Sequence, residues 1–482
     1  HDGQTVAGSM SKGWVEGSSP NREDGEEGPI PALKIEPPKS IERVLWNLPS
    51  SKSHAIRWLA LAAQSNQDVV LQNLEHAGQD IVSMRRCLSR MGVKITDLNA
   101  DGDALEAPAN HDGQPTKGSV AWKVHGVGPN GLKAPSGVLD AGNSGTALRV
   151  LMALSARFEV PVIVDGDASL RSRNHDVMID SLKQMGVNVS RRAEGDGLPL
   201  QIHGPWVPPK TLELDVSTSS QPVTAWHLSA PALPVPMDIH AVGDGVSLRH
   251  SGLTQALCER TGALPELRDG HLKPWVPALP DGTVHLPLDG SMLSFACLAA
   301  RVTRSSIHLN GLPAEEDALG NEVLLDLAPS LGLTINDASI VVCGQPKPVE
   351  VDLRHANDLI TPLAALLALG RGGTIVGAEH AAFKETDRTH GTTALLTQFG
   401  LRSSFENGVL SVDGGQSISD PSGFVRTFGD HRMQMTALIL AMGCGRTVHI
   451  EGSDLHKVAD PDAVDRWRGA GVDVEALLHQ PC

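Results

Sequence analysis

The stretch Met-Arg-Arg-Cys-Leu-Ser-Arg-Met-Gly-Val-Lys-Ile at residues 84–95 decides the fold. Its first part has the pattern of an amphipathic helix, and Val-Lys-Ile opens an apolar, β-prone segment. Gly92 stands between the two parts. Helices commonly end at a glycine in the left-handed conformation, where a residue with a Cβ would be strained. We therefore predict a helix that ends near Gly92 and passes directly into a strand.

The same helix-glycine-strand order recurs along the chain. Five further copies lie at residues 179–189 (Gly186), 253–264 (Gly262), 323–335 (Gly332), 394–401 (Gly400) and 463–474 (Gly471). A period of roughly 70–90 residues is too long for a solenoid and fits small α/β modules. The order is also common in unrelated α/β proteins, so the repeat alone leaves that alternative open. Three copies precede and three follow the Pro/Gly-bearing stretch 285–291, which predicts two domains of three modules each.

Length and charge narrow the classes of function. A chain of 482 residues exceeds one ordinary core, so two domains are expected on length as well. The net charge of -16 opposes a general nucleic-acid or anionic-membrane surface, because either needs a basic footprint. With no Tyr and seven Phe, aromatic platforms for stacking bases are not expected either. An anionic substrate would need a locally basic site.

Cysteine usage and hydropathy point to a cytoplasmic protein. The six Cys residues form no CxxC pair and no Cys/His spacing suited to zinc. No apolar stretch approaches the ~20 residues of a membrane span. Residues 1–37 are rich in Gly, Ser, Pro and Glu, so we expect a disordered tail there. We expect residues 101–137, which are polar and Gly-rich, to form an elaborated loop.

Three turns that precede apolar helices are candidate anion sites. They are Leu-Pro-Ser-Ser-Lys-Ser-His-Ala-Ile-Arg at 48–57, Asp-Ala-Gly-Asn-Ser-Gly-Thr-Ala-Leu-Arg at 140–149, and Ser-Thr-Ser-Ser-Gln-Pro at 217–222. A turn that opens a helix presents free backbone N–H groups to an anion. Lys52 and Arg57 add positive charge, while Gly145 permits close approach of a ligand. Each turn alone could equally be an ordinary helix cap. The first turn lacks the GxxxxGK[ST] spacing of a Walker loop, which disfavours an ATPase.

Charged residues gather in two later segments. Phe-Lys-Glu-Thr-Asp-Arg at 383–388 alternates acids and bases, and Phe-Gly-Asp-His-Arg-Met at 428–433 runs into an apolar stretch. Asp358 leads another apolar helix. In isolation, residues 383–388 would be interpreted as a solvated helix face. His431 would be a structural residue, and Asp358 would be a helix cap.

Taken together and in this order, the motifs resemble those of the 5-enolpyruvylshikimate-3-phosphate (EPSP) synthase family. That family carries LPGSKS followed by an Arg, NAGTAxR, a GDxSLxxRP-like segment, SxSSQ, a mid-chain Asp, KETDR and DHRM. This chain has LPSSKS with Arg57, NSGTALR, GDASLRSRN, STSSQ, Asp358, KETDR and DHRM. The resemblance extends from about residue 40 to about residue 475.

The resemblance implies a two-domain inside-out α/β barrel, the enolpyruvyl transferase fold, with three repeated units per domain and six in all. The chain would cross twice between domains. The first domain would span residues 50–288, and the second residues 38–49 plus 289–476.

The resemblance also implies the reaction: transfer of the enolpyruvyl group of phosphoenolpyruvate to the 5-hydroxyl of shikimate-3-phosphate, with release of phosphate. Asp358 would be the base for the hydroxyl, Glu385 the acid and base at C3, and Lys52 the cation at the departing phosphate. Shikimate-3-phosphate would bind to Lys52, Ser53, Arg57, Ser219, Ser220, Gln221, Ser247, Asp358 and Lys384. Phosphoenolpyruvate would bind to Lys52, Gly145, Arg173, Gln221, Arg388, Arg432 and Lys457. We expect no metal, no cofactor, no nucleic-acid or membrane partner, and a monomer.

The chain departs from the family pattern at several positions. Asn174 follows Arg173 where the family has Pro, His250 stands where many relatives have Tyr, His380 replaces a frequent Asn, and Ser51 replaces Gly. Lys457 is about one residue off the usual spacing to the next Pro. These changes concern substrate fit more than reaction type. Two alternatives stay open: a transferase acting on UDP-N-acetylglucosamine, and a non-catalytic paralogue that binds phosphorylated metabolites.

Overall fold

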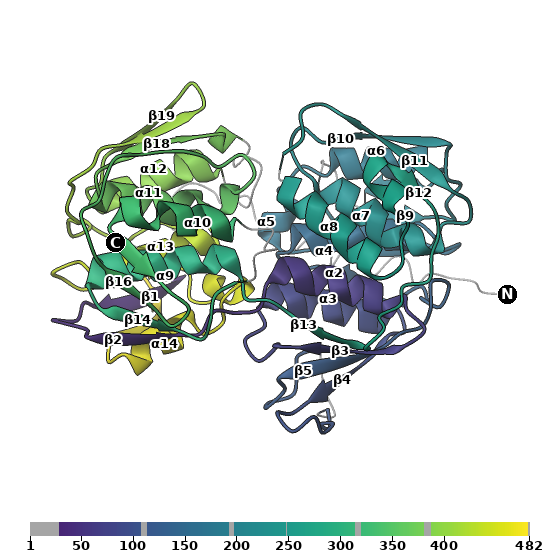
Figure 1. Ribbon diagram of the computed structural model, residues 1–482, viewed down its shortest axis with the longest axis horizontal. Helices are drawn as coiled ribbons and strands as arrows, with labels where there is room; N and C mark the ends of the chain where they lie inside the picture. Colours follow the sequence, from purple (N-terminus) through teal and green to yellow (C-terminus); the bar gives the residue numbers. More distant parts are fainter. Residues whose placement is uncertain are drawn as a thin grey trace.

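The computed structural model describes residues 28–107, 113–191, 197–246, 248–313, 320–379 and 387–480. Two hydrophobic cores organise these residues. One core draws on residues from Ala55 to Leu286. The other draws on residues from Leu33 to Leu48 and from Met292 to Val474. We call the parts of the chain around these cores the first and second lobes, which lie side by side in Figure 1.

Each lobe contains three small sheets in the described part of the chain. In the first lobe the strands, in sheet order, are β13 (Thr283–His285), β3 (Asp68–Gln72), β5 (Ala121–His125) and β4 (Lys94–Leu98); β6 (Leu139–Asp140), β7 (Val162–Asp165), β9 (Leu200–His203) and β8 (Asn188–Arg191); and β10 (Thr211–Asp215), β11 (Met237–Val242) and β12 (His271–Leu272).

In the second lobe the strands are β15 (Leu333–Ile335), β16 (Ser339–Val342), β14 (Ser306–Leu309) and β2 (Arg43–Trp46); β17 (Val349–Asp352), β18 (Gly373–Val376), β20 (Val409–Val412) and β19 (Ser403–Glu406); and β21 (Val448–Glu451), β1 (Ile30–Glu36) and β22 (Asp473–His479). Five of these six sheets contain one parallel pair, as between β3 and β13, while β1 is antiparallel to both of its neighbours.

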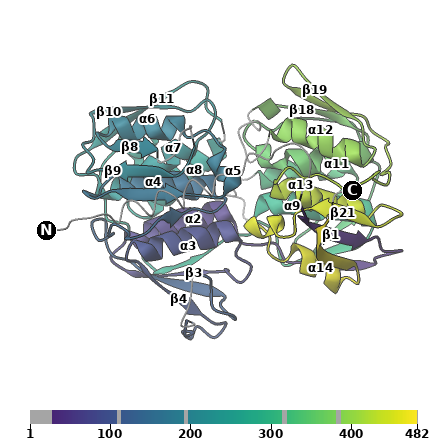
Figure 2. The same cartoon turned by 180° about the vertical axis from the view of Figure 1, so that it is seen from behind.

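Helices fill the interior of both lobes, and the sheets lie around them (Figures 1 and 2). The first lobe has α2 (Lys52–Ala63), α3 (Gln79–Arg90), α4 (Gly145–Ser155), α5 (Ala168–Arg171), α6 (Asp176–Gln184), α7 (Gln221–Ser229), α8 (Leu248–Arg260), η1 (Ala230–Ala232) and η2 (Pro265–Asp269). The second has α9 (Gly290–Thr303), α10 (Asn321–Leu327), η3 (Ala328–Leu331), η4 (Asn357–Leu359), α11 (Ile360–Leu369), α12 (Arg388–Gln398), α13 (His431–Ala441), η6 (Leu455–Val458) and α14 (Ala463–Gly469). The predicted inside-out α/β fold is confirmed.

Sequence explains which helices lie inside. Helices α2, α4 and α7 of the first lobe, and α9, α11 and α13 of the second, are buried along nearly their whole length. The sequence of α11, Ile-Thr-Pro-Leu-Ala-Ala-Leu-Leu-Ala-Leu, is apolar on every face. A helix that is apolar all round must be covered on all sides. No helix in the described ranges is both long and apolar enough to cross a membrane.

The predicted helix-glycine-strand units are mostly present. All six glycines have positive φ, from +70° at Gly332 to +110° at Gly262. Five of them lead into a strand within three residues, as Gly92 leads into β4. The copy around Gly262 differs, because Pro265 starts the 3₁₀ helix η2 before the short strand β12. The prediction of a direct helix-to-strand passage is therefore wrong for this copy.

Two predicted irregular regions contain strands. Residues 1–37 were expected to be a tail, yet Ile30–Glu36 forms the central strand β1, with Leu33 and Ile35 fully buried. The Gly and Pro content around this strand masks a short alternation of apolar residues. Residues 1–27 lie outside the described residues. The expected loop at 101–137 contains β5, where Trp122 and Val124 are buried while Lys123 between them is partly exposed.

The chain crosses between the lobes twice, at adjacent places. Ser51 N–H donates to the carbonyl of Pro287, and Asp289 N–H donates to the carbonyl of Pro49, both at 2.8 Å. From the two cores, these contacts and the pairing of β22 with β1 we infer that the domain limits are residues 50–288 for the first lobe, and residues 30–49 plus 289–479 for the second, in place of the predicted 38–49 plus 289–476.

The placement of β1 in the second core predicts a clear effect on stability. Ile35→Ala should lower the free energy of unfolding by about 2–5 kcal/mol, because it leaves a cavity beneath a central strand. Leu45→Ala, at a position 64% exposed on β2, should change it by less than about 0.5 kcal/mol. Urea unfolding measures both when it is followed by intrinsic tryptophan fluorescence, to which the packed pair Trp46 and Trp467 of this lobe contributes. Equal, small effects would contradict the assignment of β1 to the core.

Candidate active site

A pocket between the lobes lies where several helices begin. Helices α2, α4 and α7 of the first lobe start beside it, and α12 and α13 of the second lobe start on its other side. The pocket is lined by Lys52, Ser53, Ile56, Arg57, Asp80, Asn143, Ser144, Gly145, Thr146, Arg173, Thr218, Ser219, Ser220, Gln221, His250, Asp358, Arg388 and Arg432. Helix amino-termini carry unpaired backbone N–H groups and a partial positive charge, so they favour anions.

Lys52 is the first residue of α2. Ser51 caps this helix by accepting a hydrogen bond from the backbone N–H of His54. The Lys52 ammonium lies 2.8 Å from a carboxylate oxygen of Asp80, which stands near the start of α3 and is almost fully buried. The ion pair holds the end of a flexible side chain against the pocket wall.

Arg57 lies one turn further along α2 and is buried. Its guanidinium donates to the carbonyl of Ser53 at 2.9 Å and to the hydroxyl of Thr254 at 2.8 Å. Burial lowers the pKa of Arg57 to about 10, so the side chain stays charged at neutral pH. These bonds fix Arg57 as a positive charge in the pocket wall and tie α2 to α8.

The turn before α7 brings three predicted residues together. Ser219 accepts a hydrogen bond from the backbone N–H of Gln221 at 3.1 Å, and Ser220 is buried beside them. Gln221 begins the helix, with Pro222 in the first turn where no N–H is needed. The turn presents hydroxyls and an amide at the helix amino-terminus.

Gly145 lies where three polar side chains converge. A Cβ on this residue would come within 3.1 Å of Arg149 Nη1, Arg173 Nη1 and Gln221 Oε1. Arg173 donates to the carbonyl of Asn143 at 3.0 Å, which holds its guanidinium at the pocket. The absence of a side chain at position 145 therefore makes room for this cluster.

Asn174 has a structural role of its own. Its side-chain oxygen accepts from the backbone N–H of Asp176 at 2.8 Å and so starts α6, and its carbonyl accepts from Arg149 at 3.0 Å. The Asn that replaces the family's Pro therefore leaves Arg173 in the pocket.

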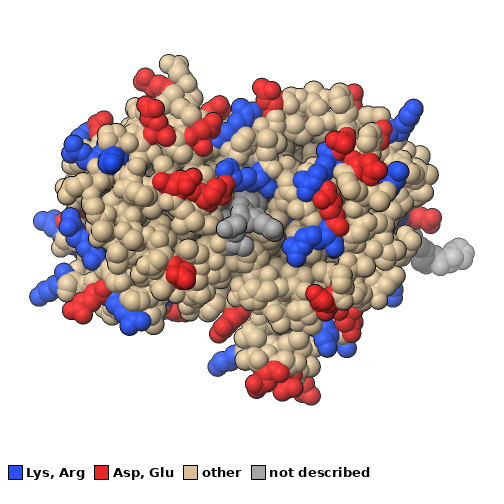
Figure 3. Space-filling model, in the orientation of Figure 1, with Lys and Arg blue, Asp and Glu red and all other residues tan. Residues whose placement is uncertain are grey.

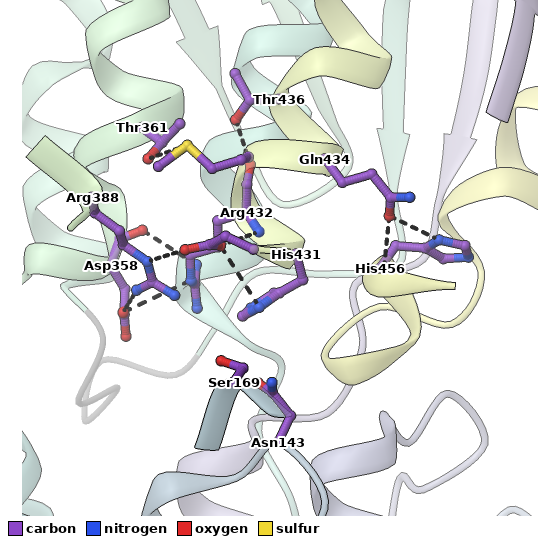
Figure 4. Close-up of polar contacts among 12 residues, drawn as sticks. Asn143, Ser169, Asp358, Thr361, Arg388, His431, Arg432, Gln434, Thr436 and His456 are labelled. Carbon is purple, nitrogen blue, oxygen red and sulfur yellow. Dashed lines mark hydrogen bonds and ion pairs between the residues drawn. The ribbon is translucent and has the colours of Figure 1, made fainter. Parts of the chain in front are cut away.

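On the opposite wall, Asp358 lies within a network of arginines (Figure 4). Arg388 donates to Asp358 at 2.8 Å and to Asp430 at 3.0 Å. Arg432 donates to the carbonyl of Asp358 at 3.2 Å and to the hydroxyl of Ser291 at 3.2 Å. Asp430 also caps α13 by accepting from the backbone N–H of Arg432. Both arginines are thereby held rigidly beside one carboxylate.

The pocket is basic although the chain is acidic. Five cations, Lys52, Arg57, Arg173, Arg388 and Arg432, are among the described residues that line it, against the two acids Asp80 and Asp358. Figure 3 shows acidic and basic side chains interspersed over one outer face. The net charge of -16 therefore coexists with a local excess of positive charge in the pocket. Such an excess concentrates anions.

Not every predicted residue is brought to the pocket. Lys457, in η6, is half-exposed, lies outside the pocket lining, and pairs with Asp454 at 2.9 Å. Ser247, Lys384, Glu385 and also His380 lie outside the described residues. His250 does line the pocket, at the start of α8.

The sequence assigned no part in ligand binding to Asp80, Asn143 or Asp430, and the residue that caps α4 is Ser144 rather than Asn143. Asp80 pairs with Lys52, Asn143 holds Arg173, and Asp430 holds Arg388. The signal for Asp430 was present, because it precedes a helix within the quoted DHRM motif. Asp80 meets Lys52 only through packing of α3 against α2. Within the described residues no three His, Cys, Asp or Glu side chains are grouped as metal ligands.

Comparison with known proteins gives relatives across nearly the whole chain. The chain is 28% identical over 440 residues to the 3-phosphoshikimate 1-carboxyvinyltransferase of Methanococcoides burtonii. The alignment covers 88% of this chain and 95% of that protein. Identity to the protein of the same name from Rhodopseudomonas palustris strain HaA2 is 28% over 455 residues, with 88% and 94% covered.

Solved structures share the fold. EPSP synthase from Acinetobacter baumannii superposes with a TM-score of 0.68 at 21% identity, covering 93% of this chain and 100% of that one. The enolpyruvyl transferase NikO from Streptomyces tendae gives 0.66 at 15% identity, covering 94% and 100%. Residues 35–467 match the family model described as EPSP synthase (3-phosphoshikimate 1-carboxyvinyltransferase), and the chain belongs to this family.

Proposed function

We propose that the protein transfers the enolpyruvyl group of phosphoenolpyruvate to the 5-hydroxyl of shikimate-3-phosphate and releases inorganic phosphate. The observation that carries this proposal is the basic pocket between the lobes, which is lined by five cations from both lobes and, among the described residues of the second-lobe wall, by one carboxylate, Asp358. Both substrates are anions that would repel each other in one cleft. A pocket with cations on two opposite walls can hold both.

The first-lobe wall suits shikimate-3-phosphate. Lys52, Ser53, Arg57, Ser219 and Ser220 supply cations and hydroxyls at the starts of α2 and α7, and such donors match the oxygens of a phosphate ester. Gln221 would serve both ligands. We assign Ser247 and Lys384 to the same ligand from the family motifs, and Asp358 would bind the hydroxyl that reacts.

The opposite side suits phosphoenolpyruvate. Arg388 and Arg432 present guanidinium groups from the second lobe, and Arg173 faces them from the first. Guanidinium groups can pair with carboxylate or phosphate oxygens through two parallel hydrogen bonds. Lys457 would join this set from η6, and Gly145 leaves space for the ligand beside Arg173.

The reaction requires addition and then elimination. Asp358 would take the proton of the 5-hydroxyl as its oxygen attacks C2 of phosphoenolpyruvate, while Glu385 protonates C3. The same glutamate, now ionised, would remove a proton from C3 as the C2–O bond to phosphate breaks and the double bond re-forms. Lys52 would stabilise the negative charge of the departing phosphate. The hydrogen bond from Arg388 at 2.8 Å supports this proposal, because it holds the Asp358 carboxylate at the pocket wall.

We also propose that the protein acts as a monomer in the cytoplasm, without a nucleic-acid or membrane partner. The acidic net charge supports the absence of a nucleic-acid partner.

The proposal is tested by incubating purified protein with shikimate-3-phosphate and phosphoenolpyruvate. Phosphate should appear together with a product heavier than shikimate-3-phosphate by one enolpyruvyl group, as measured by mass spectrometry. UDP-N-acetylglucosamine in place of shikimate-3-phosphate should give no phosphate. Release of phosphate with UDP-N-acetylglucosamine and phosphoenolpyruvate, but not with shikimate-3-phosphate, would favour the other transferase activity. Binding of the substrates without release of phosphate would favour a non-catalytic paralogue.

Asp358→Asn should lower kcat by about 10²–10⁴-fold, because it removes the general base and keeps the shape of the side chain. Thermal unfolding of the variant shows whether the Arg388 network still folds. Asp413→Asn, in an ion pair with Arg402 that is largely exposed, is the matched control and should leave kcat unchanged. A kcat for Asp358→Asn within twofold of the unmodified enzyme would rule out the role.

Gly145→Ala should raise the KM for phosphoenolpyruvate roughly tenfold and the KM for shikimate-3-phosphate by a smaller factor, because Arg173 is assigned to phosphoenolpyruvate alone and Gln221 to both ligands. The added methyl group would displace Arg173 and Gln221 by a few tenths of an ångström, and small displacements in such sites reduce rates strongly. Gly469→Ala, where a Cβ meets nothing within 4 Å, is the control. Steady-state kinetics with each substrate varied in turn would decide, and unchanged constants for Gly145→Ala would contradict the placement of this ligand.

A further inference from the structure

The short 3₁₀ helix η6, which carries Lys457, is fixed to α13 by one buried amide. Gln434 Oε1 accepts from the backbone N–H of His456 at 2.8 Å and from its Nδ1 at 3.3 Å. Gln434 Nε2 donates to the carbonyl of Gly452 at 2.7 Å. Figure 4 shows Gln434 and His456 joined in this way. A single side chain thus bonds both within η6 and to the segment that leads into it.

The chemistry of these groups makes the connection specific. Gln434 is fully buried, so its amide must find partners inside the protein. An amide oxygen only accepts, so His456 must carry its proton on Nδ1. Burial lowers the pKa of His456 to about 4, which keeps the ring neutral near neutral pH.

The hydrogen bonds between Gln434 and η6 lie close in sequence to a residue of the pocket. Gln434 lies two residues after Arg432 on α13, so the same helix carries a pocket arginine and the amide that holds η6. Asp454, Leu455 and Val458 line a second hollow between the lobes, across from Asn143 and Ser169 of the first lobe. Those two residues are hydrogen-bond partners of Arg173.

Close packing leaves η6 little freedom. A Cβ on Gly78 would come 2.6 Å from the carbonyl oxygen of Val458, so the first lobe touches the end of η6 through bare backbone. Gly78 precedes α3, whose Asp80 pairs with Lys52. A shift of η6 would therefore disturb contacts on both lobes.

We propose that Gln434 is a positioning residue that acts through Lys457: by holding His456 and Gly452 it sets the place from which Lys457 reaches phosphoenolpyruvate. The inference rests on the proposed function, which assigns Lys457 to that ligand. The Lys457 side chain is half-exposed and pairs with Asp454 of its own turn. Its backbone is therefore the part that the fold fixes, and Gln434 supplies that restraint.

Gln434→Met tests the proposal, because Met keeps the length and apolar volume of the side chain and removes all three hydrogen bonds. The KM for phosphoenolpyruvate should rise roughly tenfold, because η6 would no longer hold Lys457 in one place and small displacements of binding groups have strong effects. The KM for shikimate-3-phosphate should stay within about twofold. Thr436→Val is the matched control: Thr436 is buried on the same helix and donates to the carbonyl of Arg432 at 2.8 Å, away from η6.

A double-mutant cycle with Lys457→Met separates positioning from general damage. If Gln434 acts through Lys457, Gln434→Met should add no further rise in the KM for phosphoenolpyruvate once Lys457 is replaced. Additive effects, or equal rises in KM for both substrates, would overturn the proposal. Should Gln434→Met fail to fold, Gln434→Glu goes through the same cycle. This variant keeps the acceptor for His456 and loses the donor to Gly452, and the same selective rise is expected.

Failure of the underlying assignment gives a different result. If Lys457→Met alone leaves the KM for phosphoenolpyruvate unchanged while the enzyme still turns over, Lys457 does not bind this ligand and the proposal for Gln434 falls. Lack of turnover in the unmodified enzyme would instead overturn the proposed function itself.

Discussion

The constraint on which the structure depends is the apolar circumference of the central helices. A helix such as α11, apolar on every face, cannot lie at a surface, and all six central helices, three in each lobe, are buried along nearly their whole length. Small sheets provide the wrapping, because each covers its interior with one face and turns the other to water. The ends of the helices are the parts that wrapping does not cover. Their amino-termini meet at the cleft, so the demand for burial also generates the anion-binding surface.

The cost of this arrangement is highest at the buried arginines. Arg388 and Arg432 are each about 1% exposed, and a buried guanidinium without compensation would be strongly destabilising. Asp358 and Asp430 supply that compensation to Arg388 through hydrogen bonds of 2.8 and 3.0 Å. The Arg432 guanidinium lies 3.8 Å from the Asp358 carboxylate and donates to the Asp358 carbonyl and the Ser291 hydroxyl. The network therefore joins stability to function, since the carboxylate proposed as the base is also a partner of an arginine proposed to bind substrate. Such a carboxylate has a fixed position before any substrate arrives, which is the preorganisation that catalysis favours.

Sequence predicted the features that depend on local chemistry. Glycines that end helices, and small polar turns that begin them, act within a few residues, so the six repeats and the starts of α2, α4 and α7 could be found from patterns. Features set by packing between distant segments could not. Strand β1 is short and contains Pro31, so its own sequence does not predict a strand. It is stabilised by its pairing with β21 and β22, which come from the other end of the chain. The same holds for Asp80, which pairs with Lys52 only because α3 packs on α2. For Lys457 the local motif predicted a place in the site, but in the structure this residue forms an ion pair with Asp454 of the same turn and lies outside the pocket lining.

The residues that line the pocket are divided between the two lobes. Lys52, Arg57 and Arg173 belong to the first lobe, whereas Arg388, Arg432 and Asp358 belong to the second. Cations on the two facing walls repel each other. An anion bound between them is attracted to both walls and so offsets that repulsion. Each bound anion therefore stabilises the arrangement in which the lobes are close, by the difference in its affinity for the closed and open states. The proposed base comes from the lobe opposite the shikimate-3-phosphate cations. In the proposed reaction it would act only when both walls meet around the substrates, so the ion pairs that hold the ligands would also bring the proposed catalytic groups together.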